Sequence, residues 1–293
     1  MTDATASVRV KSRRRSQLAD VWRRLLKNQL AVIGMIMLLL LVLVAILADY
    51  LAPYPYYLQD YDHMLEGPSR AHPMGTDNFG RDILSRVIYG SRISLRIGFI
   101  SLVFGALLGS VLGAIAGFFS GYSDTLIMRF IDILMAIPGT VLAIAIATTL
   151  GPGLTNAMIA VSVNSIPRFA RVVRASTLQV KDQEYIEAAR AIGASSFRII
   201  RKYVFPNVLA PIIVQATLGV GTAIIMAAAL SFIGLGIQPP TPEWGSMLSA
   251  GRGFIRDYPH IVIFPGLAIM LTVLALNLFG DGLRDALDPK LKQ

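Results

Sequence analysis

Long runs without a single charged residue are the feature of this sequence that most restricts how the chain can fold. One run covers residues 30–48, a second covers 97–123 and a third covers 133–167. A helix needs about 20 mainly apolar residues to cross the hydrocarbon core of a bilayer. Charged residues make up only 15% of the chain, whereas they make up about 25% of soluble domains. The pattern predicts an all-α integral membrane protein.

Six membrane-spanning helices are expected. The first run is longer than the apolar part of a signal peptide, and no small-residue cleavage site follows it, so we expect a retained span. The Gly-Pro-Gly sequence at 151–153 divides the third run, because proline lacks a backbone donor and glycine permits a turn. The expected spans are residues 30–48, 97–123, two spans within 133–167, about 208–237 and about 258–279.

Three basic blocks predict the orientation of these spans. The tail before residue 30 carries eight Lys or Arg, the segment 168–202 carries eight more, and Arg284, Lys290 and Lys292 lie in the last residues. Lys and Arg are enriched on the cytoplasmic side of membrane proteins. Six crossings then place all three blocks, and both termini, in the cytoplasm. Membrane orientation therefore explains the net charge of +9 better than nucleic-acid binding does.

Motifs for catalysis are absent from the sequence. It contains no cysteine, no Gly-Lys pair for a phosphate-binding loop, no His-Glu-x-x-His and no Gly-x-Ser-x-Gly. His63, His72 and His260 fall in expected outer loops, where we expect solvated imidazoles rather than metal ligands. No catalytic residue and no metal site are expected on this chain.

Polar side chains within the expected spans are few. Arg129 and Asp132 lie three residues apart, so we expect them to pair on one helix face as an anchor rather than as an ion relay. Asn164, Gln215 and Asn277 are candidates for a substrate path. They are equally candidates for hydrogen bonds between helices.

The segment 184–207, EYIEAARAIGASSFRIIRKYVFPN, is polar and basic although apolar runs flank it. A first helix is predicted with Ile186 and Ile192, together with Tyr185 and Ala189, on one apolar face. Gly193 suits the residue after the helix end, because positive φ costs glycine nothing there. Ser195 or Ser196 is expected to cap a second short helix, and the proline at 206 is expected to end it.

Small residues on the outer side of the first helix predict a docking function. Ala188, Ala189 and Gly193 present little side chain, so the backbone can enter a groove on a partner, and Glu187 can pair with a basic group there. An amphipathic helix that lies on the membrane surface without a partner is the alternative.

The order Glu-Ala-Ala, three residues, Gly, and a proline thirteen residues later resembles the EAA loop of ABC-importer permeases. Tyr203 and Phe205 stand where that pattern has Ile and Leu, and both are bulky and apolar. The stretches at 72–94, 238–252 and 264–290 are similar to the dipeptide/oligopeptide/nickel family, in particular to the second of its two paired permeases.

This resemblance implies a type I ABC importer permease fold and a set of partners. The implied partners are a second homologous permease, two cytoplasmic ABC ATPases and an extracytoplasmic binding protein, in the inner (plasma) membrane of a bacterium. ATP and magnesium are expected on the ATPases. This chain is therefore expected to hold no cofactor and to catalyse no reaction itself, and to contact the lipid bilayer but no nucleic acid.

Two sets of site residues follow from the resemblance. The expected ATPase-coupling set is Glu187, Ala188, Ala189, Gly193, Ala194 and Ser195. The outer-loop set, expected to contact the binding protein or to gate the path, is Gly75, Thr76, Asp77, Gly80, Arg81 and Asp82. The implied organisation is a basic tail at 1–29, a first helix at 30–48, an extracytoplasmic loop at 49–92, a five-helix domain at 93–284 with a coupling loop at 170–206, and a tail at 285–293.

The expected function is ATP-driven import of di- or oligopeptides, with glutathione and nickel complexes as alternatives. A stand-alone secondary transporter is the rival of a different class. It predicts paired charges at mid-membrane and internal repeats, and the sequence offers few of the former and no convincing instance of the latter. An intramembrane enzyme needs a nucleophile and base or a metal site, and neither is found.

Overall fold

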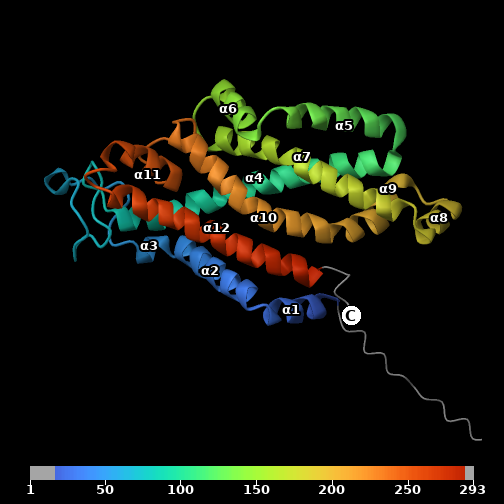
Figure 1. Ribbon diagram of the computed structural model, residues 1–293, viewed down its shortest axis with the longest axis horizontal. Coiled ribbons are helices and arrows are strands. Elements are labelled where there is room, and N and C mark those ends of the chain that lie inside the picture. Colours follow the sequence, from blue (N-terminus) through green and yellow to red (C-terminus); the bar gives the residue numbers. More distant parts are fainter. Residues whose placement is uncertain (1–16, 288–293) are drawn as a thin grey trace, which may run out of the picture.

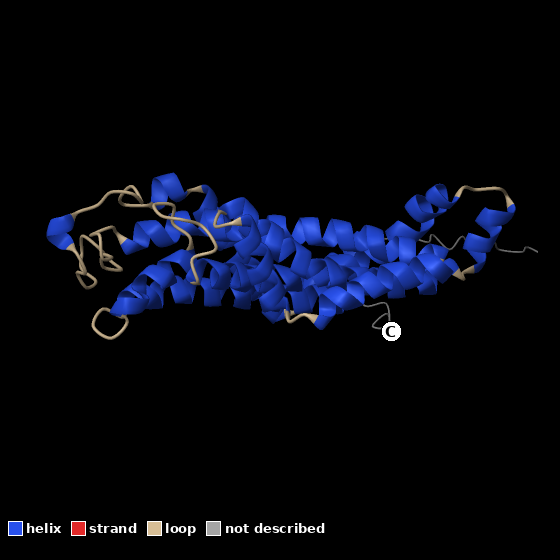
Figure 2. Ribbon diagram, turned by 90° about the horizontal axis from the view of Figure 1, so that it is seen from above, coloured by secondary structure: helices blue, strands red, loops and turns tan. Residues whose placement is uncertain are grey.

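The computed structural model describes residues 17–287, and every regular element in that range is helical. Figures 1 and 2 show an elongated bundle of long helices, with short helices and loops at its two ends. Residues 1–16 of the predicted tail 1–29, and residues 288–293 of the predicted tail 285–293, lie outside the described residues. The elements are α1 (Gln17–Lys27), α2 (Gln29–Ile46), α3 (Ala48–Leu51), η1 (Tyr61–His63), α4 (Ile83–Phe119), α5 (Gly121–Ala136), α6 (Gly139–Leu150), α7 (Leu154–Lys181), α8 (Glu184–Ala191), α9 (Ser196–Ile199), η2 (Ile200–Val204), α10 (Phe205–Phe232), α11 (Trp244–Gly251), η3 (Arg252–Phe254) and α12 (His260–Leu287).

Four helical segments are long and apolar enough to cross a membrane: α2, α4, the continuous helix Ser196–Phe232, and α12. Helices α5 and α6 together qualify as a fifth, bent by 91°. Helix α7 has 28 residues, but its three arginines lower its apolarity. The prediction of an all-α, multi-pass membrane protein is therefore confirmed. The count of six is compatible with these helices and stays a prediction.

Helix α4 begins well before the predicted start of the second span at residue 97. Asp82 is its N-cap, and the Asp82 side chain accepts a hydrogen bond from the Ser85 backbone N–H at 2.7 Å. The charged side chain of Arg92 is accommodated within the helix, because its guanidinium donates a hydrogen bond to the carboxylate of Asp49 at 2.8 Å. The outer loop that we predicted to reach residue 92 therefore ends at the Asp82 cap.

The third charge-free run contains two breaks, of which one was predicted. Helix α6 ends at Leu150 and α7 begins at Leu154, so the Gly-Pro-Gly break is confirmed. The second break lies at Pro138, where Ile137 is extended with ψ 129°. Proline disfavours the helical conformation in the preceding residue, and this local effect explains the bend between α5 and α6.

Helix α7 continues through Pro167 to Lys181. The helix therefore does not end at this proline as the sequence suggested, and where the fourth span leaves the membrane stays a prediction. Pro167 is buried inside the helix. Membrane helices tolerate proline where neighbouring helices and small adjustments of the backbone compensate for the missing hydrogen bond, and α7 packs closely along α4 at this point.

The contact between α4 and α7 is the most extensive one between helices in the described chain. Every fourth residue of α4 from 105 to 117 is a glycine. A Cβ atom on Gly109 would lie 2.5 Å from the carbonyl oxygen of Ile166 and 2.7 Å from Cβ of Phe169. The absence of side chains lets the two backbones approach. These contacts also give the register of the two helices: Ile166 and Phe169 of α7 lie beside Gly109 of α4.

Helix α11 packs against the long helices at the end of the bundle opposite α8 (Figure 1). Trp244 is buried, and its Nε1–H donates to the carbonyl oxygen of Val87 in α4 at 3.0 Å. The carboxylate of Glu243 caps α11 by accepting from the backbone N–H groups of Gly245 at 2.9 Å and Ser246 at 2.8 Å. Burial of the Glu243 carboxyl raises its pKa, and these hydrogen bonds oppose the shift.

Candidate functional site

Helix α8 and the bend that follows it form the predicted coupling loop. Gly193 has φ +80°, and its N–H donates to the carbonyl of Arg190 at 2.9 Å. The N–H of Ala194 donates to the carbonyl of Ala189 at 3.0 Å. This pair of bonds is the Schellman motif, which satisfies the last carbonyls of a helix and requires a left-handed residue. The predicted glycine bend is confirmed.

Ser195 caps the next helix. Its hydroxyl accepts from the N–H of Arg198 at 3.4 Å. The prediction that Pro206 ends this helix is wrong, because the helix is continuous from Ser196 to Phe232. Residues 200–204 form a π-helical turn, in which the N–H of Phe205 bonds to the carbonyl of Ile200. Pro206 follows directly after this π-helical turn, in the first turn of α10.

The buried face of α8 consists of Ile186 and Ala189, which are 0% and 3% exposed. The prediction that Ile192 shares this face is wrong, since Ile192 is 84% exposed. A helix advances 100° per residue, so position 192 lies about 240° round from 186. The placement of Ala189 on the outer side is also wrong. Glu187 and Ala188 are exposed, as the docking prediction requires.

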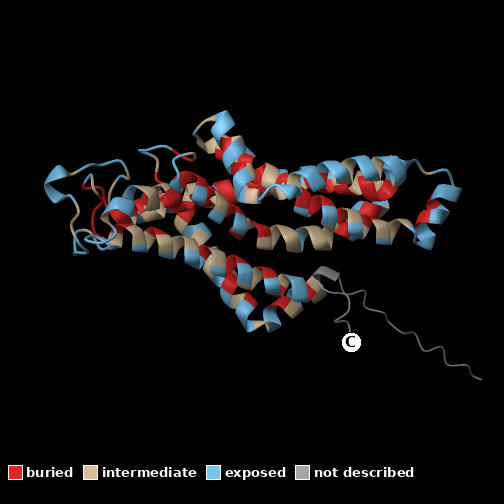
Figure 3. Cartoon of the chain, turned by 45° about the horizontal axis from the view of Figure 1, so that its top comes forward, coloured by how far each residue is buried: buried red, intermediate tan, exposed pale blue. Residues whose placement is uncertain are grey.

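Exposed apolar side chains near the bend were not foreseen. Phe197 is 73% exposed and stands, with Ile192, on either side of Gly193. Figure 3 shows this end of the molecule as mainly exposed. Large apolar side chains that water can reach mark surfaces for partners. Their positions close to Gly193 in the sequence are the signal that could have predicted this exposed apolar surface.

Three contacts hold α8 to the long helices. The guanidinium of Arg190 lies over the ring of Phe118 in the last turn of α4. The ring of Tyr185 lies against that of Tyr203, with the centroids 6.2 Å apart. The side-chain amide of Asn207 donates to the hydroxyl of Tyr185 at 3.4 Å. Helix α8 is therefore attached to α4 and to the start of the long helix Ser196–Phe232.

The outer-loop set is folded against itself. The Arg81 Nε–H donates to the carboxylate of Asp77 at 2.7 Å, and both side chains are buried. Thr76 and Asp82 are also buried, and the whole stretch lies in the loop shown at the end of the molecule opposite α8 (Figure 3). These side chains shape the loop, and contact with a binding protein stays a prediction.

The backbone conformation of this loop requires glycine at two positions. Gly75 has φ +78°, and a Cβ atom on it would lie 2.5 Å from the carbonyl oxygen of Glu66. Gly80 has φ +70°, and a Cβ atom there would overlap the backbone of Asp60. Positive φ and close backbone approach are the two conditions that only glycine meets without strain.

The expectation of solvated histidines holds only for exposed His63. The Nδ1 of His72 lies 2.9 Å from the carboxylate of Asp82, and the His72 side chain is 13% exposed. The His260 ring packs against Gly75. Within residues 17–287 no group of three potential ligands suits a metal ion.

The predicted pair of Arg129 and Asp132 is not formed. Asp132 instead accepts from Arg171 of α7 at 2.7 Å. A second ion pair joins the same two helices, with Arg174 bonded to Asp124 through two nitrogens. Spacing of three residues permits a pair within one helix, but an arginine on a neighbouring helix is the partner here.

The three path candidates do not surround one cavity. Asn164 lies in α7 against Gly139, and Gln215 of α10 lines a cavity of about 630 Å³. Asn277 is exposed on α12. The 630 Å³ cavity lies between α7, α10 and α12, and its polar lining includes Gln179, Asn207 and Arg284.

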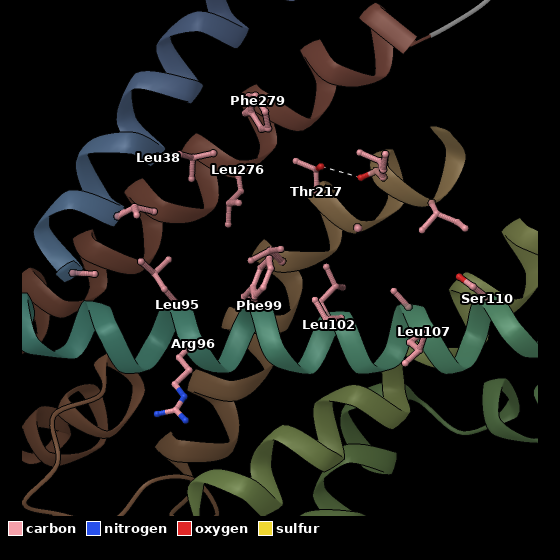
Figure 4. Close-up of a pocket in the computed structure, with 18 of the residues that line it drawn as sticks. Leu38, Leu95, Arg96, Phe99, Leu102, Leu107, Ser110, Thr217, Leu276 and Phe279 are labelled. Carbon is pink, nitrogen blue, oxygen red and sulfur yellow. Dashed lines mark hydrogen bonds between the residues drawn. The ribbon is translucent and has the colours of Figure 1, made fainter. Parts of the chain in front are cut away.

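A larger cavity of about 1020 Å³ lies between α2, α4, α10 and α12. Figure 4 shows Phe99 and Leu102 of α4 and Phe279 of α12 among its walls. Its lining is almost wholly apolar. A peptide would lose its hydration there without gaining hydrogen bonds, so this cavity does not suit a polar substrate.

Comparisons with known proteins agree with these features. A family model described as binding-protein-dependent transport system inner membrane component matches residues 109–293. A second, the N-terminal TM domain of oligopeptide transport permease C, matches residues 16–68. The glutathione transport system permease protein GsiD of Escherichia coli O6:K15:H31 (strain 536 / UPEC) is 51% identical over 276 residues, which cover 93% of this chain and 90% of that protein.

A relative from Pectobacterium atrosepticum with the same name is 49% identical over 281 residues, or 95% of this chain and 93% of its own length. Among solved structures, an inward-facing conformation of the MetNI methionine ABC transporter matches with a TM-score of 0.58 at 20% identity. The match covers 70% of this chain and 98% of that one. At this identity the likeness concerns the fold alone.

Proposed function

This chain belongs to the binding-protein-dependent transport system inner membrane components, and we propose that it is the permease subunit through which an ABC importer takes up glutathione or a similar small peptide. The assignment of the substrate rests on the 51% identity, over 93% of the chain, to a glutathione transport system permease protein. Glutathione is a tripeptide, so it falls within the peptide class that the sequence motifs indicate. Among the expected substrates, these relatives favour glutathione over dipeptides.

The proposed assembly contains a second six-span permease, two cytoplasmic ATPases and an extracytoplasmic binding protein. ATP and magnesium belong to the ATPases in this proposal. The N-terminal tail and α8 then face the cytoplasm, and α11 and the loop at 52–82 face outward. The distribution of Lys and Arg supports this orientation.

Coupling is proposed to run through α8. The surface of α8 that could enter a groove on an ATPase is exposed and consists of Glu187, Ala188 and the Gly193 bend. The exposed side chains of Ile192 and Phe197 add apolar contact area beside it. Closure of the two ATPases on ATP would displace α8. Because α8 contacts both α4 and the long helix Ser196–Phe232, its displacement shifts the balance between inward-facing and outward-facing arrangements.

Reconstitution of the complete importer tests this function. The chain is co-purified with its second permease and ATPases, and placed in liposomes with ATP inside and binding protein outside. We expect accumulation of radiolabelled glutathione that requires ATP and the binding protein, with a dipeptide and a nickel complex as competing substrates. Uptake by this chain alone, driven by a proton or sodium gradient, would support the stand-alone secondary transporter instead.

A further inference from the structure

The 1020 Å³ cavity between α2, α4, α10 and α12 is open along one side. Three of the α4 side chains that line it, Phe99, Val103 and Leu107, are 62%, 46% and 59% exposed. Figure 4 shows Leu38 of α2 and Leu276 of α12 on the wall that faces α4. Water finds few hydrogen-bond partners in such a space, so an apolar ligand suits it better.

Two arginines of α4 lie at the end of this cavity nearer to α11. The guanidinium of Arg92 donates to the carbonyl of Ile46, the last residue of α2, at 2.7 Å. Because α2 is long and apolar enough to cross a membrane, this end of the cavity is level with the end of a span. Arg96 lies one turn further along α4, about 6 Å deeper, and a long arginine side chain reaches back to the interface from that depth.

The two arginines differ in their partners. The charge of Arg92 is balanced by Asp49, whose carboxylate lies 2.8 Å away. The Arg96 side chain is exposed and has no carboxylate within ion-pair distance among residues 17–287. One end of an apolar cavity therefore carries one surplus positive charge, at the level where a bilayer places its phosphate groups.

We propose that this cavity binds one phospholipid with a net negative charge, with its phosphate on Arg96 and an acyl chain along α4. A guanidinium can donate two parallel hydrogen bonds to a phosphate. The cavity follows α4 from Arg96 to Leu107, about 16 Å of helix, which is about half of the 30 Å hydrocarbon core. That is the depth that the chains of one leaflet cover. The bound lipid fills the space between α2 and α10.

A helix of the second permease is the competing occupant. It could bond to the hydroxyl of Ser110, which is buried at the far end of the cavity and has no hydrogen-bond partner among residues 17–287. Such a helix would also need an acidic residue below the membrane surface to balance Arg96, and acidic residues are rare inside membrane helices because they are costly there. A lipid brings its phosphate to the interface without that cost, so the charge of Arg96 favours the lipid.

Photo-crosslinking in the assembled importer tests the site, because this chain contains no cysteine. Val103→Cys is labelled with benzophenone maleimide in an importer whose other chains lack cysteine. The complex is placed in nanodiscs of phosphatidylcholine with a minor fraction of phosphatidylglycerol and is irradiated. Mass spectrometry then gives the ratio of the two lipids among the adducts. Phe104→Cys is the control at matched depth, because Phe104 is 55% exposed and does not line the cavity.

We expect the share of phosphatidylglycerol among the adducts of Val103→Cys to be about fivefold higher than among those of Phe104→Cys, because one arginine near the surface attracts an anionic lipid by about that factor. Arg96→Gln in the Val103→Cys background should lower the share to that of the control. Arg96→Lys should retain part of the enrichment, since the charge remains. Arg256→Gln removes an exposed arginine outside the cavity lining and should change nothing.

Three results would overturn the lipid site. The first is a crosslink from Val103→Cys to the second permease, which would show that a helix fills the cavity. The second is an equal share of phosphatidylglycerol at the two labelled positions, and the third is an enrichment that survives Arg96→Gln. If Arg96→Gln prevents assembly of the importer, the comparison of Val103→Cys with Phe104→Cys decides, with arginine and then with lysine at position 96. The substrate of the importer does not enter this test, so the outcome is separate from that of the uptake experiment.

Discussion

The guanidinium carbon of Arg190 lies 5.3 Å from the centre of the Phe118 ring. Arg190 belongs to α8, and Phe118 belongs to the last turn of α4, so this cation–π contact joins the predicted coupling loop to a helix of 37 residues. Tyr185 and Tyr203 join α8 to the start of the long helix Ser196–Phe232. A force applied at α8 therefore reaches two membrane-crossing helices together.

Glu187→Lys should abolish import without reducing the amount of chain in the membrane. The Glu187 side chain is exposed and makes no hydrogen bond within the described chain, so its loss costs little folding energy. Import is measured in liposomes and membrane content by immunoblot. Asp182→Lys, the same charge change on an exposed residue before α8, is the control and should transport normally. Wild-type uptake by an inserted Glu187→Lys variant would falsify the coupling role.

Gly193→Asn should be tolerated and Gly193→Val should not. Space is not the reason, since a Cβ atom at Gly193 would meet nothing within 4 Å. The reason is φ +80°, a conformation that costs most residues about 1–2 kcal/mol and that asparagine adopts more readily. We expect the Val variant to lose most ATP-dependent uptake. Equal uptake by both variants would show that the Schellman bend is dispensable.

Gly109→Val should destabilise the protein strongly, because its side chain would press on the backbone of α7 at Ile166. Overpacking of a tight core costs about 1–3 kcal/mol. Leu108→Val, on the exposed neighbour, is the control and should be nearly neutral. Thermal unfolding in detergent compares the two. A midpoint for Gly109→Val that matches the control would contradict the close approach of α4 and α7.

Arg171→Gln should lower the thermal midpoint more than Arg129→Gln does. Removal of Arg171 leaves Asp132 without its partner, whereas Arg129 has no ion pair among residues 17–287. Both side chains of the pair are about half exposed, so the expected difference is small, about 0.2–1 kcal/mol. Asp132→Asn combined with Arg171→Gln should recover part of the loss. Equal effects of the two single substitutions would instead favour the pair within α5 that the spacing suggests.

Glu243→Gln should change how stability depends on pH. Burial raises the pKa of Glu243 above its ordinary value of 4.5, so the folded state holds the proton more tightly than the unfolded chain. The resulting stabilisation is complete below pH 4.5 and is lost as pH rises through the raised pKa. Glutamine does not titrate, so the midpoint advantage of the unsubstituted protein should be larger at low pH than at neutral pH. An advantage that is constant with pH would rule out titration of this carboxyl.

Local chemistry made several features readable from the sequence. Long uncharged runs predict membrane helices because each such helix satisfies its own backbone hydrogen bonds in lipid. The bend at Gly193, the cap at Ser195 and the break at Gly-Pro-Gly follow from residues whose conformations are set within a few positions. The family motif predicts a coupling loop from the sequence for the same reason, since its pattern is a run of neighbouring residues.

Tertiary contacts decided the rest. Pro138 bends the chain and Pro167 does not, although both prolines lie in the same uncharged run. The difference is that α7 is packed along α4 at Pro167, and such packing compensates for one missing hydrogen bond. Asp132 pairs with Arg171 across 39 residues rather than with its neighbour Arg129. This pairing depends on where the glycines of α4 let α7 pack, which is a property of two helices together.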